Sequence, residues 1–411
     1  MLKRGAFESF DRISSLPKEV IGEILILLPI RDAIKTSLLS SNWRYKWNSM
    51  PQLVFNRDSM LSTKNSDLVK FVDCVLLLHN GVISEFKLVK FLDICCSDVE
   101  RWMVVLSKKG LQHLVLSFKK EGEFYKAPTC LFNCEKLRTL SLDRCELRVP
   151  SQFRGMSYLT NLEFRYVRLT NETFEKLVLE LPFLGTLKLV RCKPLDRINV
   201  RAQNLKAVHI YDFITSINFH NSPNIVNLYM RPGMSRTQSL DDILYGLDEL
   251  QFVDLTYPRI KLNFAPDAAW VELHAIYHRL TCAVFRINFR DPSQILSVIF
   301  LCRRSPCLEK LKIVDTANFS FGITFKEPFW DARLRKEDVF HHLKSVRLDG
   351  FRGTELELGL AQFILMNALV LETLDISWKH VMLKDCEKLR AVVKITQFER
   401  ASSKAKVIFC D

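Results

Sequence analysis

A short leucine pattern recurs along most of this 411-residue chain and constrains its fold more than any other feature. The pattern is Leu-x-x-Leu-x-Leu, and other apolar residues replace some of the leucines. Residues two apart point to the same side of a β-strand, so each copy predicts a short strand with one buried face. Clear copies begin at Ile83, Leu111, Leu137, Leu159, Leu184, Leu205, Ile225, Leu250, Leu308, Leu343 and Leu371, and a weaker one spans Leu280–Phe285.

The copies start 20 to 35 residues apart, and a spacing in the twenties is the period of leucine-rich repeats. One repeat cannot cover its own apolar face, so neighbouring repeats are expected to stack into an α/β solenoid with short parallel strands and a concave sheet. Cys145 and Cys192 each follow the last leucine of a copy by three residues, which predicts small buried turn residues whose S–H groups meet backbone carbonyls. The alternative is an ordinary α/β domain in which the pattern recurs by chance, and the near-regular spacing disfavours it.

The N-terminal segment 11–47 has a different, helical pattern. Ser14 and Ser15 can cap a helix, and Pro17 suits a first turn, where its missing N–H is no loss. Apolar spacing predicts a helix over Lys18–Leu28 that ends at the next proline. Its apolar residues form two stripes that point in different directions, so both need to be covered. The stripes are Val20, Ile24 and Leu27, and Ile21, Leu25 and Leu28.

Two shorter helices are expected next, one over about Arg31–Leu39 and one that carries Trp43 and Trp47. Three small helices cannot bury all these large side chains among themselves, so the surplus apolar surface implies a partner. The partner could be another protein or the repeats of the same chain. In the second helix the residues expected to point inward are Ala33, Ile34, Ser37 and Leu38.

The residue order of this segment, SLPKEVIGEILILLPIRDAIKTSLLSSNWRYKW, resembles an F-box of the plant type, which begins D-R-I-S-x-L-P and ends L-S-x-x-W-x-x-x-W. The resemblance implies a three-helix module that binds a Skp-family adaptor and, through it, the cullin and RING subunits of an SCF ubiquitin ligase. Asn42 stands where the family usually has Lys or Arg, and this difference affects one contact at the rim of the implied adaptor interface. The implied adaptor-binding residues are Leu16, Pro17, Val20, Ile21, Ile24, Leu25, Leu28, Pro29, Ile34, Ser37, Leu39, Ser40 and Trp43.

Near the other end, residues 341–376 resemble the FBD segment found after the F-box and leucine-rich repeats of plant proteins. The resemblance rests on Leu343-Lys-x-Val, Gly350-Phe-x-Gly-Thr-Glu, Leu360-Ala-x-Phe-Ile-Leu-x-Asn-Ala and Val370-Leu-Glu-x-Leu. From the residues alone, this stretch reads as a strand, a glycine-bearing loop, a helix over about 355–366 and another strand.

Two further stretches flank the repeats. Before them, Val54–Phe55 predicts a strand and Asn65–Leu78 a helix. After the FBD-like segment, Leu389–Thr396 and Ala405–Cys410 are expected to be edge strands, and Val407–Phe409 would close the apolar end of the solenoid. The predicted domains are an F-box over 1–50, a leucine-rich-repeat solenoid over 51–330, and FBD-like repeats with a cap over 331–411.

A client protein is expected to bind the variable positions of the repeat, which face the concave side of such a solenoid. These positions lean basic and include an aromatic residue, which suits a protein surface or an anionic ligand. The predicted client-binding residues are Arg138, Lys188, Lys206, His209, Tyr229, Lys312 and Arg347, and neighbouring variable positions are Ser141, Asp143, Asp254 and Asp375.

The net charge of +13 raises nucleic-acid binding as an alternative. Lys and Arg are dispersed, however, with no basic run longer than a pair such as Lys108–Lys109. A solvated surface, or a patch for an acidic or phosphorylated protein, is the favoured interpretation. A steep salt dependence of binding to random DNA would be the mark of the nucleic-acid alternative.

No motif of a catalytic, nucleotide-binding or metal site occurs: GxxxxGK[ST], GxGxxG after a strand, GxSxG, HExxH and CxxC are all missing. The expectation is therefore a non-catalytic protein without a cofactor, whose twelve cysteines are reduced and mostly buried. No signal peptide and no apolar run of spanning length is seen, so a soluble protein of the nucleus or cytoplasm is expected. The leading hypothesis is a substrate-recognition subunit of an SCF-type ligase, and the alternative is an interaction scaffold that recruits no ligase.

Overall fold

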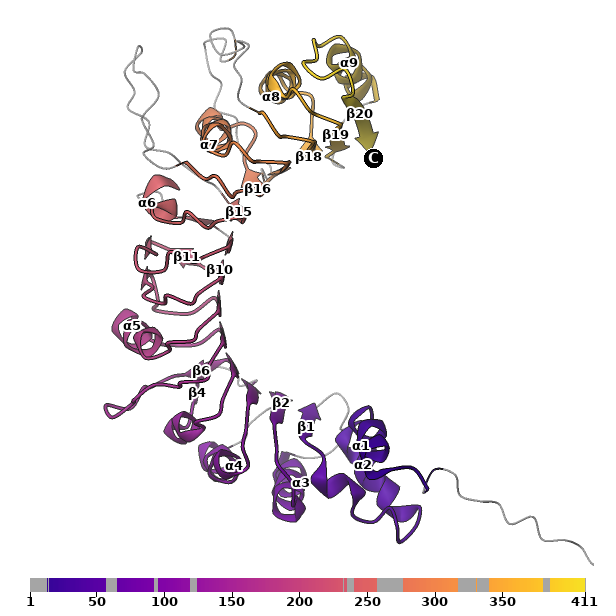
Figure 1. Cartoon of the computed structure of the whole chain (residues 1–411), viewed down its shortest axis with the longest axis vertical. Helices are drawn as coiled ribbons and strands as arrows, with labels where there is room; N and C mark the ends of the chain where they lie inside the picture. The colour runs from indigo at the N-terminus through magenta and orange to yellow at the C-terminus, as the bar shows by residue number, and fades with distance from the viewer. Residues whose placement is uncertain are drawn as a thin grey trace, which may run out of the picture. The chain divides into compact units, whose positions relative to one another are not determined.

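The computed structural model describes residue 13 and residues 15–56, 65–91, 95–118, 124–231, 233–234, 240–256, 276–316, 330, 340–379 and 385–410. These residues belong to two compact units, Met1–Leu169 and Thr170–Asp411, each of which is described by itself (Figure 1). Ser14, one of the predicted helix caps, lies outside the described residues.

The first unit begins with small helices and continues with parallel strands. The strands pair in the order β1-β2-β3-β5-β7, and the helices of the repeats lie on one side of them (Figure 1). Its helices are α1 (Lys18–Ile26), α2 (Ile30–Lys35), the 3-10 helices η1 (Thr36–Leu38) and η2 (Lys46–Ser49), α3 (Asn65–Leu78), α4 (Cys96–Lys108) and the 3-10 helix η4 (Thr129–Asn133). Its strands are β1 (Gln52–Asn56), β2 (Glu85–Phe91), β3 (His113–Phe118), β5 (Thr139–Asp143) and β7 (Asn161–Arg165), with a small pair of β4 (Tyr125–Lys126) and β6 (Cys145–Glu146).

The second unit continues the same plan. Its main strands pair in parallel in the order β8-β10-β13-β15-β16-β17-β18-β19-β20. They are β8 (Thr186–Val190), β10 (Ala207–Tyr211), β13 (Asn227–Met230), β15 (Phe252–Thr256), β16 (Cys282–Ile287), β17 (Lys310–Asp315), β18 (Ser345–Phe351), β19 (Thr373–Trp378) and β20 (Lys406–Cys410). The helices are α5 (Asn171–Leu179), α6 (Leu240–Leu244), α7 (Pro292–Arg303), α8 (Glu355–Asn367) and α9 (Asp385–Thr396). Two small sheets pair β9 (Arg197–Asn199) with β12 (Ser216–Asn218) and β11 (Phe213–Ile214) with β14 (Gly233–Met234).

The leucine pattern places these strands. Within the first unit, Leu140 of β5 lies beside Leu114 of β3 and Leu162 of β7, and all three side chains are buried. In the second unit, Val208 of β10 lies in the same way between Leu187 and Leu228. Because register follows the apolar face, every repeat adds its residues to one continuous layer within its unit. The predicted strands are confirmed, and the weak copy at 280–285 is β16.

The turn cysteines and the FBD helix also agree with the predictions. Cys145 and Cys192 are buried, and the Cys192 thiol donates to the Val190 carbonyl over 3.7 Å. Helix α8 begins at a capping box, in which the Thr354 hydroxyl accepts from the Glu357 backbone N–H while the Glu357 carboxylate accepts from the Thr354 N–H. Satisfying two N–H groups in this way accounts for a well-formed helix start.

Three secondary-structure predictions were wrong. Residues 389–396 form most of helix α9 rather than an edge strand, because Ala391 and Ile395 stand one helical turn apart and are both buried. Trp43 and Trp47 are both buried, and turns and the 3-10 helix η2 hold them in place of the expected third α-helix. Pro17, not a serine, is the residue before α1, with no side-chain cap hydrogen bond.

The cysteines depart from the prediction as well. All twelve are free thiols, as expected, but only Cys134, Cys145, Cys192 and Cys302 are buried. Burial raises the pKa of Cys134 and of Cys302 to about 12, so these two thiols are poor nucleophiles.

A left-handed residue follows the strand in three successive repeats. Arg144, Tyr166 and Arg191 come directly after β5, β7 and β8 with φ of 58°, 50° and 49°. Gly350 holds the corresponding position in a later repeat, with φ of 84°, where the pairing of β18 shifts register. A left-handed residue with a side chain costs about 1 kcal/mol. In the first unit, the Arg144 guanidinium lies 5.0 Å from the Tyr166 ring centre, a cation–π contact that partly offsets this cost.

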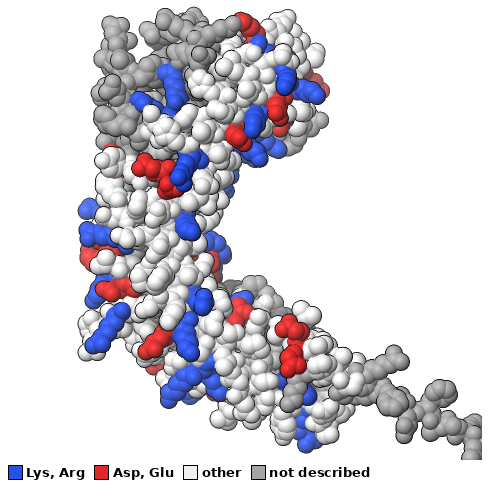
Figure 2. Space-filling view, viewed as in Figure 1, with Lys and Arg blue, Asp and Glu red and all other residues white. Residues whose placement is uncertain are grey.

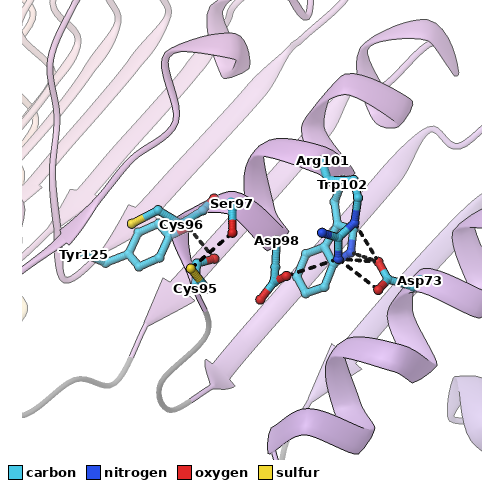
Figure 3. A network of polar contacts seen from close by, with 8 residues as sticks. All are labelled: Asp73, Cys95, Cys96, Ser97, Asp98, Arg101, Trp102 and Tyr125. Carbon is cyan, nitrogen blue, oxygen red and sulfur yellow. Dashed lines mark hydrogen bonds and ion pairs between the residues drawn. The ribbon is translucent and has the colours of Figure 1, made fainter.

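A polar network ties the first two long helices together (Figure 3). Asp73 of α3 accepts from the Arg101 guanidinium at 2.9 Å and from the Trp102 indole N–H at 2.7 Å, both on α4. Arg101 also donates to Asp98, one turn earlier, at 3.1 Å. The contacts join Asp73 to a buried indole, so they hold α3 against α4 more firmly than an exposed ion pair alone could.

At the other end of this network, Cys95 precedes α4 and is exposed. The Ser97 hydroxyl donates to the Cys95 sulfur at 3.1 Å, and this hydrogen bond lowers the pKa of the thiol (Figure 3). We expect Cys95 to react with iodoacetamide at pH 7.5 long before Cys134 and Cys302. Replacing Ser97 with Ala should slow its alkylation about threefold, because less thiolate would be present. Peptide mass spectrometry over time measures both rates, and an unchanged Cys95 rate in the variant would refute the role given to Ser97.

Candidate functional site

Helix α1 separates the two apolar stripes expected of it. Ile21 and Leu25 are buried, whereas Val20, Ile24 and Leu27 are exposed. The helix packs against α2 and η2, and α2 packs against β1, so the chain itself covers Ile21 and Leu25 of one stripe, whereas its third member, Leu28, is exposed. The other stripe is left open to solvent.

The turn after α2 adds two more exposed leucines. Leu38 is 86% and Leu39 71% exposed, although Leu38 was expected to point inward. The prediction for Leu38 was wrong because α2 ends at Lys35 and the 3-10 helix η1 turns this residue outward. Many large apolar side chains are therefore exposed within a short segment, which we call the N-terminal apolar set. Its members are Ile13, Val20, Ile24, Leu27, Leu28, Leu38 and Leu39.

The predicted adaptor-binding residues fall into three groups. Exposed members are Pro17, Val20, Ile24, Leu28, Pro29 and Leu39, and partly buried members are Leu16, Ile34, Ser37 and Ser40. Ile21, Leu25 and Trp43 are buried in the chain's own core. Direct contact of these three with an adaptor does not fit their burial, and we assign them to holding the small helices together. Leu27 and Leu38, among the most exposed of all, were missing from the predicted residues.

A second surface lies on the sheet of the second unit. In-register pairing sets one residue from each strand in a row: Lys188, His209, Tyr229, Asp254, Val284, Lys312, Arg347 and Asp375. Most of the predicted client-binding residues are thus brought together on this sheet. The His209 and Tyr229 rings stack with centres 4.2 Å apart, and Phe252 lies 4.8 Å from Tyr229.

Arg138 and Lys206 depart from this row. Each precedes its strand, and the carbonyl of each accepts hydrogen bonds from the turn of the following repeat. Their side chains therefore stand at the leading edge of the strands, and Arg138 belongs to the first unit. The expectation that these two lie on the strand face was wrong, because the strand begins only at the third residue of the pattern.

Three carboxylates of the second unit each hold two cations, and we call these groups triads. In the first, Asp254 accepts from Arg231 and from Arg286, at 3.2 Å and 3.3 Å between Nε and Oδ1. Asp254 is buried, while both arginines are partly exposed. Burial lowers the pKa of Arg231, and the neighbouring positive charge of Arg286 lowers it further.

The second triad joins Asp349 of β18 to Lys312 and Arg347, each at 2.7 Å. Burial alone would raise the pKa of Asp349, but the hydrogen bonds from Arg347 and Lys312 outweigh it and lower the pKa. The third joins Asp315 to Arg352 at 2.9 Å and to Lys379 at 2.7 Å, with the carboxylate fully buried. Figure 2 shows charges of both signs side by side over the part of the molecule where Figure 1 labels β16 and β18.

Sequence reasoning missed Arg231, Arg286, Arg352 and Lys379. Arg286 had a signal, because it stands two positions past Val284 and so shares the outward face of β16 with it. Arg231, Arg352 and Lys379 each come after the end of a strand, where the alternating pattern no longer indicates which way a side chain points. Among the described residues, no group of three or more His, Cys, Asp or Glu side chains could hold a metal ion. Within the same ranges, none of the helices combines the length and the apolar character needed to cross a membrane.

Comparison with known proteins matches three consecutive segments. The F-box domain model matches residues 13–55, the FBD model matches residues 339–376, and the model described as "FBD-associated F-box protein At5g56370, LRR repeats" matches residues 99–313. These matches agree with the order of elements in the fold.

Relatives from Arabidopsis thaliana match over nearly the whole chain. F-box/FBD/LRR-repeat protein At1g13570 is 32% identical, over 98% of this chain and 99% of that protein. FBD-associated F-box protein At5g56370 is 26% identical over 94% of each, and F-box/FBD/LRR-repeat protein At5g56420 is 25% identical over 97% and 99%. The resemblance drawn from the residues is confirmed, and the chain belongs to the plant F-box/FBD/leucine-rich-repeat family.

Proposed function

We propose that this protein is the substrate receptor of an SCF-type ubiquitin ligase, with the N-terminal helices bound to a Skp-family adaptor and the repeats bound to a client. The observation that carries the proposal is the N-terminal apolar set. A soluble chain rarely exposes seven large apolar side chains within 27 residues unless another protein covers them. The match of the F-box model to residues 13–55 indicates which partner that would be.

Such a receptor does no covalent chemistry. It holds the client next to the ubiquitin-charged enzyme that the cullin and RING subunits recruit, which raises the effective concentration of client lysines there. The role needs no cofactor and no catalytic side chain in this chain. A location in the nucleus or the cytoplasm, where such ligases would meet their clients, is part of the proposal.

The alternative is a scaffold whose small helices pack only on their own chain. The packing of α2 against β1, the first strand of the sheet, favours it. Ile30 and Ala33 of α2 are buried, while the N-terminal apolar set stays exposed. The receptor is therefore the better account.

Co-expression of the full chain with a Skp-family adaptor tests the proposal. We expect a stable one-to-one complex in size-exclusion chromatography, which should then bind cullin and RING subunits. When the activating and conjugating enzymes and ubiquitin are added, the assembled complex should ubiquitinate proteins that the repeats have captured. A folded chain that elutes alone in the presence of the adaptor would support the scaffold instead.

A further inference from the structure

The accessible charge on the second-unit sheet is positive at defined points. In the first triad, one carboxylate faces two guanidinium groups, and in the second, one carboxylate faces Lys312 and Arg347. Counted over its own three side chains, each triad therefore has a net charge of +1, and Asp375, the in-register neighbour of Arg347, lies beside the second triad. The Lys312 and Arg347 side chains are 39% and 50% exposed, so a partner can reach them.

The first triad has an added reason to accept an anion. Its two arginines are partly buried and near each other, and the pKa of Arg231 is lowered by burial and by Arg286. A second carboxylate placed between solvent and these guanidinium groups would relieve their mutual repulsion. Hydrogen bonds between guanidinium and carboxylate groups are among the stronger ones in proteins, and partial burial strengthens them.

An apolar platform lies beside this charge. Tyr229 and Asp254 are paired neighbours on β13 and β15. The Tyr229 ring stacks on that of His209 and contacts that of Phe252 at a tilt. Arg286 and Arg347 stand two strands and two residues apart, so strand geometry places their Cα atoms about 10–12 Å from each other. An extended peptide spans this distance in three or four residues.

We propose that the second-unit sheet binds an acidic, extended peptide segment of a client, with carboxylates three or four residues apart and an apolar residue beside the first. The inference rests on the proposed function in calling the partner a client. A nucleic acid fits less well, because it presents a phosphate at every nucleotide, and Asp375, which belongs to neither triad, would repel part of that charge. Carboxylates at intervals can avoid this aspartate.

The test is the binding of the purified full chain to an array of random eight-residue peptides at 100 mM NaCl. We expect the bound peptides to be enriched at least about threefold in Asp and Glu, and their binding to weaken at 400 mM NaCl. A parallel array with phosphoserine in place of glutamate distinguishes the two sources of negative charge. Stronger binding there would assign the segment to phosphorylated clients.

The double variant Arg286→Gln, Arg347→Gln removes one cation from each accessible triad. Asp254 keeps Arg231 and Asp349 keeps Lys312, so neither carboxylate is left alone. We expect binding of acidic peptides to weaken about tenfold. The matched control is Arg197→Gln, Arg201→Gln, which removes the same charge from β9 and the residues just after it and should leave binding unchanged.

Four results would overturn the inference: no peptide bound, enrichment in Lys and Arg, equal binding by the double variant, or tighter binding of a twenty-nucleotide oligo(dT). Adaptor capture by the same variants is measured separately. A chain that captures the adaptor but shows no preference for acidic peptides would refute only the peptide inference. A chain that prefers acidic peptides but does not capture the adaptor would refute only the ligase role.

Discussion

Replacing Leu27 and Leu38 with aspartate is expected to abolish capture of a Skp-family adaptor. The two side chains are 84% and 86% exposed in the free chain, so the substitutions should leave the fold intact. Each leucine that becomes buried in a complex contributes about 1.5–3 kcal/mol, and a buried aspartate would add a further penalty. Together these effects should weaken binding more than about a hundredfold, measured by titration of the adaptor in calorimetry.

A matched control lies in the same unit. Leu77 and Leu78 of α3 are 82% and 55% exposed but lie outside the F-box match. Leu77→Asp with Leu78→Asp should therefore bind the adaptor as the unaltered chain does. Equal loss in both double variants would mean that acidic substitutions act non-specifically. Unchanged capture by the Leu27 and Leu38 variant would remove these residues from the interface.

Removing the Asp315 carboxylate should destabilise the second unit strongly. Arg352 and Lys379 remain only 17% and 22% exposed, and Asp315→Ala would leave both charges without this buried partner. Breaking a buried ion pair from one side costs about 3–5 kcal/mol. For a unit of this size we expect the melting temperature to fall by roughly 10 °C, measured by circular dichroism.

The second triad supplies the comparison. Asp349→Ala removes a carboxylate from β18, the strand next to that of Asp315, but Lys312 and Arg347 can turn to water. Exposed pairs contribute at most about 1 kcal/mol, so the melting temperature should fall by only a few degrees. Equal shifts for the two variants would contradict the view that burial, not the number of charges, sets the cost.

The strands were predictable because each uses its own leucines. Apolar residues at every second position determine both that the segment is a strand and which of its faces is buried. Even the weak copy at 280–285 follows this rule. The FBD helix was predictable for a similar reason, since Thr354 and Glu357 cap it from within the segment. Helix α9 was missed because β-branched residues such as Val392 and Val393 suggest a strand. Ala391 and Ile395, at helical spacing, carry its packing.

The triads could not be found in this way. Apart from Arg347 and Asp349, which share β18, their members come from different repeats: Asp254 lies 23 residues from Arg231 and 32 from Arg286, and Asp315 lies 64 from Lys379. Such distances depend on loop lengths, which the pattern does not fix. The predicted adaptor-binding surface posed a different problem. The spacing of apolar residues showed that α1 has two apolar stripes, but it could not show which stripe the rest of the chain would cover.

The left-handed residues after β5, β7 and β8 bear on how such proteins diversify. Each marks a fixed point at which the backbone leaves its sheet, whatever follows. The three repeats that contain them start 21 to 25 residues before the next one and still supply equivalent strands, so the difference in length is absorbed in the connecting segments. A substitution in the row of outward-facing strand residues and an insertion in the segments that connect the strands therefore affect separate parts of the structure. Exchange of the residues in the proposed client-binding row would thus leave the framework that displays them unchanged.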